Sequence, residues 1–280
     1  MRKRRFVGLK GVTLVADEAG PEAGAPILLL HGGGQTRRSW KNAVTRLAAE
    51  GYLVIAPDTR GHGESDWAGD ADYTLEALVG DLRAMVNTLP AKPALVGASL
   101  GGITALSLLG EHDAPDVRAL VLVDTAPRID MEGAKKITAF MSANANGFAS
   151  VEDAADSVAA YNTNRSRPKD VSGLRRNLRE VDGRLYWHWD PAFMGTKRIE
   201  AGVSRPRLES AAKRLDVPTL LVRGALSDLV GDEQVDHFRS LMPQASFVDV
   251  AGAGHMVAGD HNDAFNDAIL AFLSRVDGRA

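Results

Sequence analysis

The chain of 280 residues contains no cysteine, which excludes disulfide bonds, thiolate metal sites and a cysteine nucleophile. It also has no apolar run long enough to span a membrane, so we expect no membrane partner. Charge of one sign does not dominate either, because 33 Lys and Arg oppose 36 Asp and Glu, for a formal net charge of −3. A basic face that could bind nucleic acid is therefore not expected.

An export signal is not readable at the start of the chain. The first five residues, "MRKRR", resemble the positive end of a signal peptide, but no sustained apolar region follows them. Together with the absence of cysteine, this leads us to expect a cytoplasmic protein. The length suits one large α/β domain or a domain with an insertion.

Short apolar segments alternate along the chain with segments of helical periodicity. Several of the apolar segments are apolar on both faces, as strands of a buried parallel sheet must be. The expected strands are Val12–Ala16, Ile27–Leu30, Leu53–Ala56, Ala94–Gly97, Ala119–Val123, Thr219–Arg223 and Ser246–Val250. The expected helices are Trp40–Glu50, Leu75–Leu89, Leu100–Gly110, Asp232–Leu241 and Asp263–Arg275. This alternation predicts an α/β fold with a mostly parallel, doubly wound sheet.

One segment, from about residue 128 to residue 215, interrupts this alternation. It contains no convincing strand. Its helix-like stretches are Gly133–Ala145, Val151–Tyr161 and Leu174–Val181. The sequence therefore predicts a core made of residues 1–127 and 216–280, and a helical insertion over residues 128–215.

Ser99 stands between two glycines in "GASLG", residues 97–101, directly after an expected strand and directly before an expected helix. So abrupt a turn forces its central residue into strained backbone angles, and flanking glycines leave the room that it needs. The hydroxyl would then be exposed at the carboxyl end of the strand. Taken alone, the pentapeptide is equally compatible with a tight turn of small residues, so its context must decide.

Polar residues follow other expected strands too, at the edge where an open α/β sheet binds ligands. A serine nucleophile needs a base, an acid that orients the base, and donors that stabilise the oxyanion. Ser99, Asp228 and His255 occur in this order and each follows a strand, which predicts nucleophile, acid and base. The backbone N–H groups of Gly33 and Leu100 are the expected oxyanion-hole donors.

Five segments around these residues are "LLLHGGG", "IAPDTRGHGESD", "VGASLGG", "LLVRGALSDLV" and "VAGAGHM". They resemble motifs of the alpha/beta-hydrolase family and follow one another in the order of that family. The resemblance covers nearly the whole chain and implies the alpha/beta-hydrolase fold, with a helical cap inserted after the sixth strand. Family members that open epoxides or remove halogens carry an aspartate where this chain has Ser99, so the resemblance implies acyl transfer to serine instead.

Asp124 competes with Asp228 for the role of the acid, because some family members take the acid from the earlier strand. The surroundings of Asp228 match the family's usual acid loop and favour it, and "LVDTAP" around Asp124 is equally compatible with a structural turn. His31 is expected to brace the oxyanion loop, and His62 to serve the packing of its turn. No pair of histidines has the spacing of metal ligands, so we expect neither a metal nor another cofactor.

The segment "YWHWDPAF", residues 186–193, gathers aromatic side chains around His188. It is either the core of the cap or part of the wall of an apolar substrate pocket. Under the second interpretation, Trp187, Trp189 and Phe193 are candidate substrate-binding residues, together with Gly34 of the oxyanion loop.

The expected activity is hydrolysis of a small carboxylic ester or lactone through an acyl-enzyme on Ser99. Perhydrolysis, in which peroxide replaces water as in relatives called haloperoxidases, and hydrolysis of carbon–carbon bonds use the same triad and stay open. A ligand receptor or regulatory protein that retains the triad is the non-enzymatic alternative, and only turnover separates it from an enzyme. The expected partner is thus a small molecule. The sequence does not indicate an oligomeric state.

Overall fold

An eight-stranded sheet forms the centre of the protein, for which a computed structural model describes residues 1–161, 167–195, 204–254 and 262–279. The strands are β1 (Arg2–Val7), β2 (Thr13–Ala19), β3 (Pro26–Leu30), β4 (Leu53–Pro57), β5 (Ala94–Ala98), β6 (Ala119–Val123), β9 (Thr219–Gly224) and β10 (Ser246–Val250). Their order in the sheet is β1-β2-β4-β3-β5-β6-β9-β10. All pairs from β4 to β10 are parallel, and β2 is antiparallel to both of its neighbours. The predicted mostly parallel sheet is confirmed.

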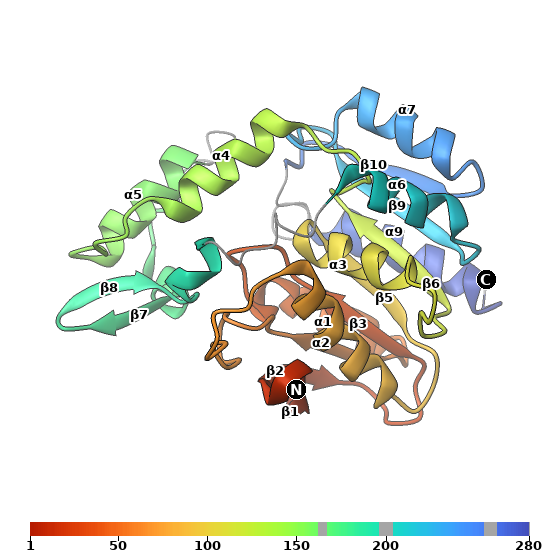
Figure 1. The fold of residues 1–280 in the computed structure, drawn as a ribbon, viewed down its shortest axis with the longest axis horizontal. Coiled ribbons are helices and arrows are strands. Elements are labelled where there is room, and N and C mark those ends of the chain that lie inside the picture. Colours follow the sequence, from red (N-terminus) through yellow and green to blue (C-terminus); the bar gives the residue numbers. More distant parts are fainter. Residues whose placement is uncertain (162–166, 196–203, 255–261, 280) are drawn as a thin grey trace.

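Helices cover both faces of this sheet (Figure 1). One face carries α1 (Lys41–Ala49) and α9 (Asn262–Val276), and the other carries α2 (Leu75–Asn87), α3 (Leu100–Leu109), α6 (Arg205–Arg214) and α7 (Asp232–Leu241). Because successive residues of a strand point to opposite faces, Ile27 and Leu29 of β3 pack toward α1 and α9, and Leu28 packs toward the other layer. None of the described helices has both the length and the apolar character that crossing a membrane requires.

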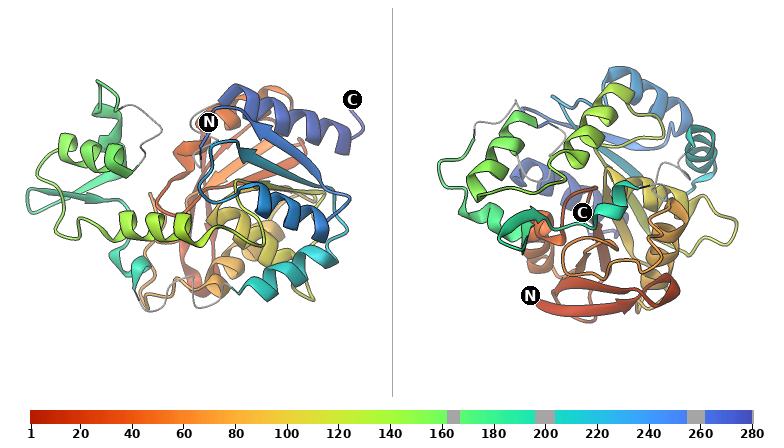
Figure 2. Two further views of the ribbon diagram at one scale, coloured as in Figure 1. Left: turned by 90° about the horizontal axis from the view of Figure 1, so that it is seen from above. Right: turned by 60° about the vertical axis from the view of Figure 1, so that its left-hand side comes forward.

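A third layer stands beside the sheet, where α4, α5 and a small hairpin lie together (Figures 1 and 2). Its elements are α4 (Met131–Ser142), α5 (Val151–Tyr161), the short helix η3 (Ser172–Asn177), β7 (Leu178–Val181), β8 (Arg184–Trp187) and the short helix η4 (Pro191–Met194). This layer, called the cap below, has its own apolar cluster, which includes Phe148, Leu178, Leu185 and Trp187. As predicted, it follows the sixth strand of the chain.

The prediction that residues 128–215 contain no strand is wrong, because β7 and β8 form an antiparallel hairpin. The stretch Leu174–Val181, predicted as helix, divides between the end of η3 and the whole of β7. The hairpin turn is Asp182-Gly183, and both residues have positive φ, 49° and 74°. An Asp-Gly pair between short alternating segments is a strong hairpin signal, and it was available in the sequence.

Two further differences concern the boundaries of the core. The sequence did not predict β1, an edge strand in which Phe6 is the one buried residue and the arginines Arg2 and Arg4 bind Glu18 of β2. The helix α6 falls within the range predicted for the cap, yet it packs against α3 of the core. The two helices approach closely at Gly110, the residue that follows α3. A Cβ atom at Gly110 would overlap the Cβ atom of Ala211 in α6.

Candidate active site

Ser99 occupies a sharp turn between β5 and α3. Its backbone angles are φ 47° and ψ −113°, in the positive-φ region that residues other than glycine seldom adopt. A Cβ atom at Gly97 would lie 2.5 Å from the backbone carbon of Gly101, and one at Gly101 would overlap the carbonyl of Leu30. Both glycines are therefore needed for the turn. The surrounding packing holds Ser99 in a strained conformation, as is common for reactive residues.

A cavity of about 1380 Å³ extends from Ser99 toward the cap. Gly33, Gly34 and Leu100 line it on the side of the core. Most of the remaining wall consists of apolar side chains, among them Ile103, Ile137, Phe140, Met141, Tyr161, Leu174, Trp187, Trp189, Phe193, Met194, Leu208 and Leu229. The nucleophile predicted from the sequence thus opens into a large and mainly apolar space.

Two backbone N–H groups beside Ser99 have no hydrogen-bond partner within the described part of the chain, namely those of Gly33 and Leu100. The neighbouring N–H groups are used, because Gly32 donates to the Gln35 side chain (3.1 Å) and Gly34 donates to Nε2 of His62 (3.1 Å). The Leu100 N–H also lies at the N-terminus of α3, where the helix dipole favours negative charge. Both predicted oxyanion donors are therefore available to a ligand.

The two candidate acids have very different surroundings. Asp124 follows β6, is 1% exposed, and its carboxylate accepts hydrogen bonds from the Ser227 hydroxyl (2.6 Å) and from the Gly224 N–H (3.1 Å). Its backbone φ is 48°. The side chain of Asp228 is 56% exposed, and its carboxylate lies 3.5 Å from Nζ of Lys136 on α4.

The strand β6 also lies next to β5, so Asp124 follows the strand that neighbours the nucleophile. The Ser99 N–H donates to the carbonyl of Val123, the residue before Asp124, at 3.1 Å. His255, the predicted base, falls in residues 255–261, which lie outside the described residues. The chain leads toward it from β10 through Ala253, whose carbonyl accepts a hydrogen bond from the Leu226 N–H (2.8 Å).

Comparison with known proteins decides the family. Residues 25–262 match the family model described as alpha/beta hydrolase fold. The chain belongs to this family. It is 30% identical over 266 residues to an esterase of Mycobacterium tuberculosis, in a match that covers 88% of this chain and 82% of that protein.

Other relatives are hydrolases by name. The chain is 28% identical to a 2-hydroxy-6-oxo-6-(2'-aminophenyl)hexa-2,4-dienoic acid hydrolase of Metapseudomonas resinovorans, over 97% of this chain and 91% of that protein. Among solved structures, an E-2-(acetamidomethylene)succinate hydrolase superposes with a TM-score of 0.84 at 27% identity, covering 98% of this chain and 99% of that one. These likenesses support a hydrolase.

The predicted oxyanion loop comprises residues 31–35. Three buried histidines of this alpha/beta hydrolase lie there, because His31 is the first residue of the loop and the rings of His62 and His188 contact Gly34. The rings of His31 and His62 have centroids 5.4 Å apart, and those of His62 and His188 are 5.7 Å apart. In each ring one nitrogen accepts from a backbone N–H: Nε2 of His31 from Thr59 (2.9 Å), Nε2 of His62 from Gly34, and Nδ1 of His188 from Gly63 (3.0 Å). Each ring must therefore be neutral, with its proton on the other nitrogen.

The protonated nitrogens point at backbone carbonyls. Nδ1 of His31 lies 2.8 Å from the Gly32 carbonyl, Nδ1 of His62 lies 3.1 Å from that of Arg60, and Nε2 of His188 lies 3.3 Å from that of Gly34. The predicted roles of His31 and His62 in bracing and packing agree with these contacts. The sequence did not indicate the contact of His188 with the oxyanion loop.

Acidification should destabilise the protein through these rings. Burial lowers the pKa of His188 from 6.5 to about 4, with a further lowering from His31, and the hydrogen bond to the Gly34 carbonyl and the charge of Asp58 partly oppose this shift. The unfolded chain therefore binds protons first as the pH falls. Stability from this ring is complete above about pH 6.5 and is lost between pH 6.5 and 4, by up to roughly 3 kcal/mol.

The melting temperature measured from pH 7.5 to pH 4.5 checks this expectation. The His188→Gln variant lacks the titrating group, so its melting temperature should decline less steeply with acidification than that of the wild type. The matched control is His112→Gln, at an exposed position, which should keep the wild-type slope. An equally steep decline in all three proteins would contradict the prediction.

Aromatic rings form a continuous row along the cavity. The rings of Trp189 and Trp187 stack at 5.2 Å with 13° between their planes, Trp187 lies 5.7 Å from Phe140, and Phe140 stacks on Tyr161 at 4.5 Å. The row begins at the oxyanion loop, because a Cβ atom at Gly34 would lie 3.4 Å from Cζ3 of Trp189. Trp187 and Trp189 therefore belong both to the apolar cluster of the cap and to the cavity wall.

Phe193 also lines the cavity, but its ring packs edge-on against His62 at 4.6 Å. The loop after β4 supports this part of the cap. The Asp190 N–H donates to the Gly61 carbonyl (2.8 Å), and the Tyr73 hydroxyl donates to the Asp190 carboxylate. The segment 188–193 is thereby fixed to the core.

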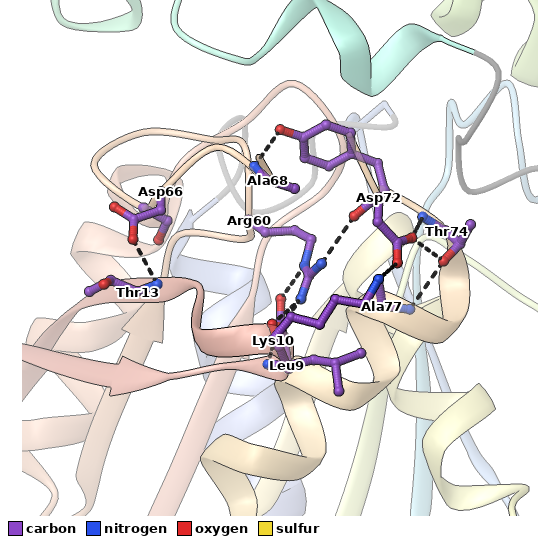
Figure 3. Close-up of polar contacts among 12 residues, drawn as sticks. Leu9, Lys10, Thr13, Arg60, Asp66, Ala68, Asp72, Thr74 and Ala77 are labelled. Atoms are coloured by element: carbon purple, nitrogen blue, oxygen red, sulfur yellow. Dashed lines mark hydrogen bonds and ion pairs between the residues drawn. The ribbon is translucent and has the colours of Figure 1, made fainter. Parts of the chain in front are cut away.

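The supporting loop is itself held by buried charge. The Arg60 guanidinium binds both carboxylate oxygens of Asp81 at 2.6 Å and donates to the carbonyls of Asp72 (3.0 Å) and Leu9 (3.2 Å), as Figure 3 shows for the labelled residues. An unpaired buried charge would be very costly, so this bidentate pair requires one arrangement of the loop. No local pattern in the sequence marks Arg60 and Asp81 as partners, because they lie 21 positions apart.

Proposed function

We propose that the protein is a serine hydrolase that cleaves a carboxylic ester or lactone with an apolar acyl group, through an acyl-enzyme on Ser99. The observation that carries this proposal is the placement of Ser99. It combines a strained backbone, an opening into the cavity and two free N–H donors beside it. Nucleophilic catalysis by serine needs access to the substrate and donors for the oxyanion, and a strained strand-to-helix turn is the way in which this fold exposes the hydroxyl.

In the proposed mechanism, His255 removes the proton of Ser99 as the hydroxyl oxygen attacks the substrate carbonyl. The N–H groups of Gly33 and Leu100 stabilise the oxyanion of the tetrahedral intermediate. His255 then protonates the leaving alkoxide, and the acyl-enzyme forms. Water, activated by the same imidazole, hydrolyses the acyl-enzyme and regenerates Ser99.

For the acid that orients His255 we propose Asp124, although the local sequence favours Asp228. A buried carboxylate held by two donors has one fixed position, from which it can select a tautomer of the base. The exposed carboxylate of Asp228 is solvated and faces Lys136, so its interaction with an imidazole would be screened.

A parallel screen of wild type and Ser99→Ala tests the proposed function. The substrates are short and long aliphatic esters, aryl esters and lactones, and peracid formation is measured with peroxide present. Wild-type turnover of esters or lactones that disappears in Ser99→Ala supports the proposal. Stoichiometric acylation of the wild type without turnover would instead indicate a receptor.

The aromatic row leads us to expect that Trp187 and Trp189 set the preference for the acyl group. Replacing either with alanine should lower kcat/KM for aryl or long-chain esters by about 10- to 100-fold, because about 1–3 kcal/mol of apolar contact is lost. Acetyl esters do not reach along the row and should change by less than about threefold. The check is the ratio of kcat/KM for an aryl ester to that for an acetyl ester.

Trp67→Ala is the matched control for this prediction. Trp67 is 41% exposed and stacks under the Arg179 guanidinium at 4.7 Å, away from the residues that line the cavity. Its loss should leave the ratio unchanged. If both cap variants lowered kcat/KM for all esters by the same factor, the row would be a structural core with no role in substrate choice.

A further inference from the structure

Three consecutive peptide groups of the oxyanion loop are each held by a different imidazole. His31 binds the Gly32 carbonyl, which belongs to the peptide between Gly32 and Gly33. His62 accepts from the Gly34 N–H, part of the next peptide. His188 contacts the Gly34 carbonyl, part of the third. Two of these imidazoles come from the core, and that of His188 comes from the cap.

Such support matters here because the hydrogen bonds within the loop do not by themselves select one conformation of its central peptide. The Gln35 N–H donates to the Gly32 carbonyl (3.1 Å), which closes a turn with Gly33 and Gly34 at its centre. Gly34 has φ 72°, and glycines in both central positions permit several turn types that differ by a flip of the central peptide. The hydrogen bond of the Gly34 N–H with His62 selects one orientation of that peptide.

The orientation of the loop determines where the oxyanion donor points. A peptide group is planar, so the Gly33 N–H points opposite to the Gly32 carbonyl. The Gly32 carbonyl is held by His31 and by the Gln35 N–H, so the direction of the Gly33 N–H depends on the turn keeping its conformation. The turn adjoins Ser99, because a Cβ atom on Gly32 would lie 3.3 Å from Cβ of Ser99. An oxyanion donor is effective only when it is held in place before the reaction.

We propose that His62 and His188 are positioning residues that clamp Gly34 from the core and from the cap, so that the oxyanion hole is correctly formed only while the segment 188–193 is docked. This inference rests on the proposed function, because it assigns the Gly33 N–H to the oxyanion. Two hydrogen bonds dock this segment on the core: the Gly63 N–H donates to Nδ1 of His188, and the Asp190 N–H donates to the Gly61 carbonyl.

The cap contact also links the hole to the acyl pocket. Trp189 follows His188 in the chain, and the two rings pack edge-on at 5.3 Å. An acyl group that rests on the aromatic row therefore contacts the segment that holds Gly34. In this proposal, binding of a long acyl group against Trp189 favours the position of His188 that holds the oxyanion loop.

Two amide variants at each position separate the contact with Gly34 from the other contact of the same ring. In His188→Gln the side-chain amide reaches the place of Nε2 and can donate to the Gly34 carbonyl, whereas His188→Asn can only replace Nδ1 and keep the contact with Gly63. Likewise, His62→Gln can accept from the Gly34 N–H, whereas His62→Asn keeps the contact with the Arg60 carbonyl. Rates are normalised to the sites titrated by a fluorophosphonate, so unfolded protein does not count.

The Asn variants should lose about 10- to 100-fold in kcat with KM changed by less than about threefold, because a displaced donor weakens the transition state and not ground-state binding. The Gln variants should lose clearly less. His237→Asn on α7, where the imidazole contacts Glu209 (3.1 Å), is the control and should keep the wild-type kcat.

Equal kcat values for Gln and Asn at either position, whether both wild-type or both reduced, would overturn the clamp. If one pair does not yield titratable sites, the other pair decides by the same criterion. Ser99→Ala is measured alongside. Turnover that survives in Ser99→Ala refutes the proposed function itself, whereas loss of turnover there with no difference within the pairs refutes the clamp alone.

Discussion

Replacing Ser99 with alanine should lower kcat by about a thousandfold or more and abolish formation of the acyl-enzyme. In the proposed mechanism the hydroxyl is the attacking group, so that in the variant only the oxyanion donors and the cavity remain to assist direct attack by water. The fold should be retained, because alanine is smaller than serine and the side chain faces the cavity. Ester hydrolysis and covalent labelling by a fluorophosphonate, read as a mass increase of the intact protein, measure the two effects.

Ser107→Ala is the matched control. Ser107 lies in α3 with its hydroxyl buried and without a partner within the described residues, so its loss should affect neither labelling nor turnover. His255→Ala should be as inactive as Ser99→Ala, because nucleophile and base act as a unit. A Ser99→Ala variant that reacts with the probe as fast as the wild type would refute the assignment of the nucleophile.

The elements that the sequence predicts well are those buried on both sides. Every residue of β3, β4 and β6 is buried, so each strand is a continuous apolar run between turn residues. The strands that were not predicted have mixed surroundings. In β1 only Phe6 is buried, and β7 and β8 are four residues each, with charged residues on the exposed face. Their stability depends on partners that are distant in sequence or on a turn, and not on periodicity.

The candidate active-site residues also divide into those that local features predict and those that depend on distant contacts. Ser99 and Leu100 are predictable because a strand, a serine between glycines and a helix are all local features. The histidine contacts that join separate segments are not local, since His188 binds the N–H of Gly63, 125 positions earlier, and His62 binds that of Gly34, 28 positions earlier. The choice of acid also depends on loop conformation, because Asp124 follows its strand directly whereas Asp228 lies four residues beyond the end of β9.

The different positions of Asp124 and Asp228 lead to the second prediction with a large effect on activity. Asp124→Asn should lower kcat by roughly a thousandfold or more, because a neutral amide can neither stabilise the imidazolium of His255 nor select its tautomer. Asp228→Asn should change kcat by less than about threefold, since its exposed carboxylate faces Lys136 and solvent. Initial rates with one ester substrate, at equal concentrations of folded protein, give the comparison.

The two asparagine variants are well matched, because each alters charge without altering shape. Asparagine tolerates the positive φ of 48° at position 124 better than most residues, and its carbonyl oxygen can still accept from the Gly224 N–H. The melting temperature of Asp124→Asn should therefore stay near that of the wild type while kcat falls. Should Asp228→Asn prove the less active of the two, the acid is the one that the local sequence favours. The buried carboxylate of Asp124 would then only hold the loop around Gly224 and Ser227.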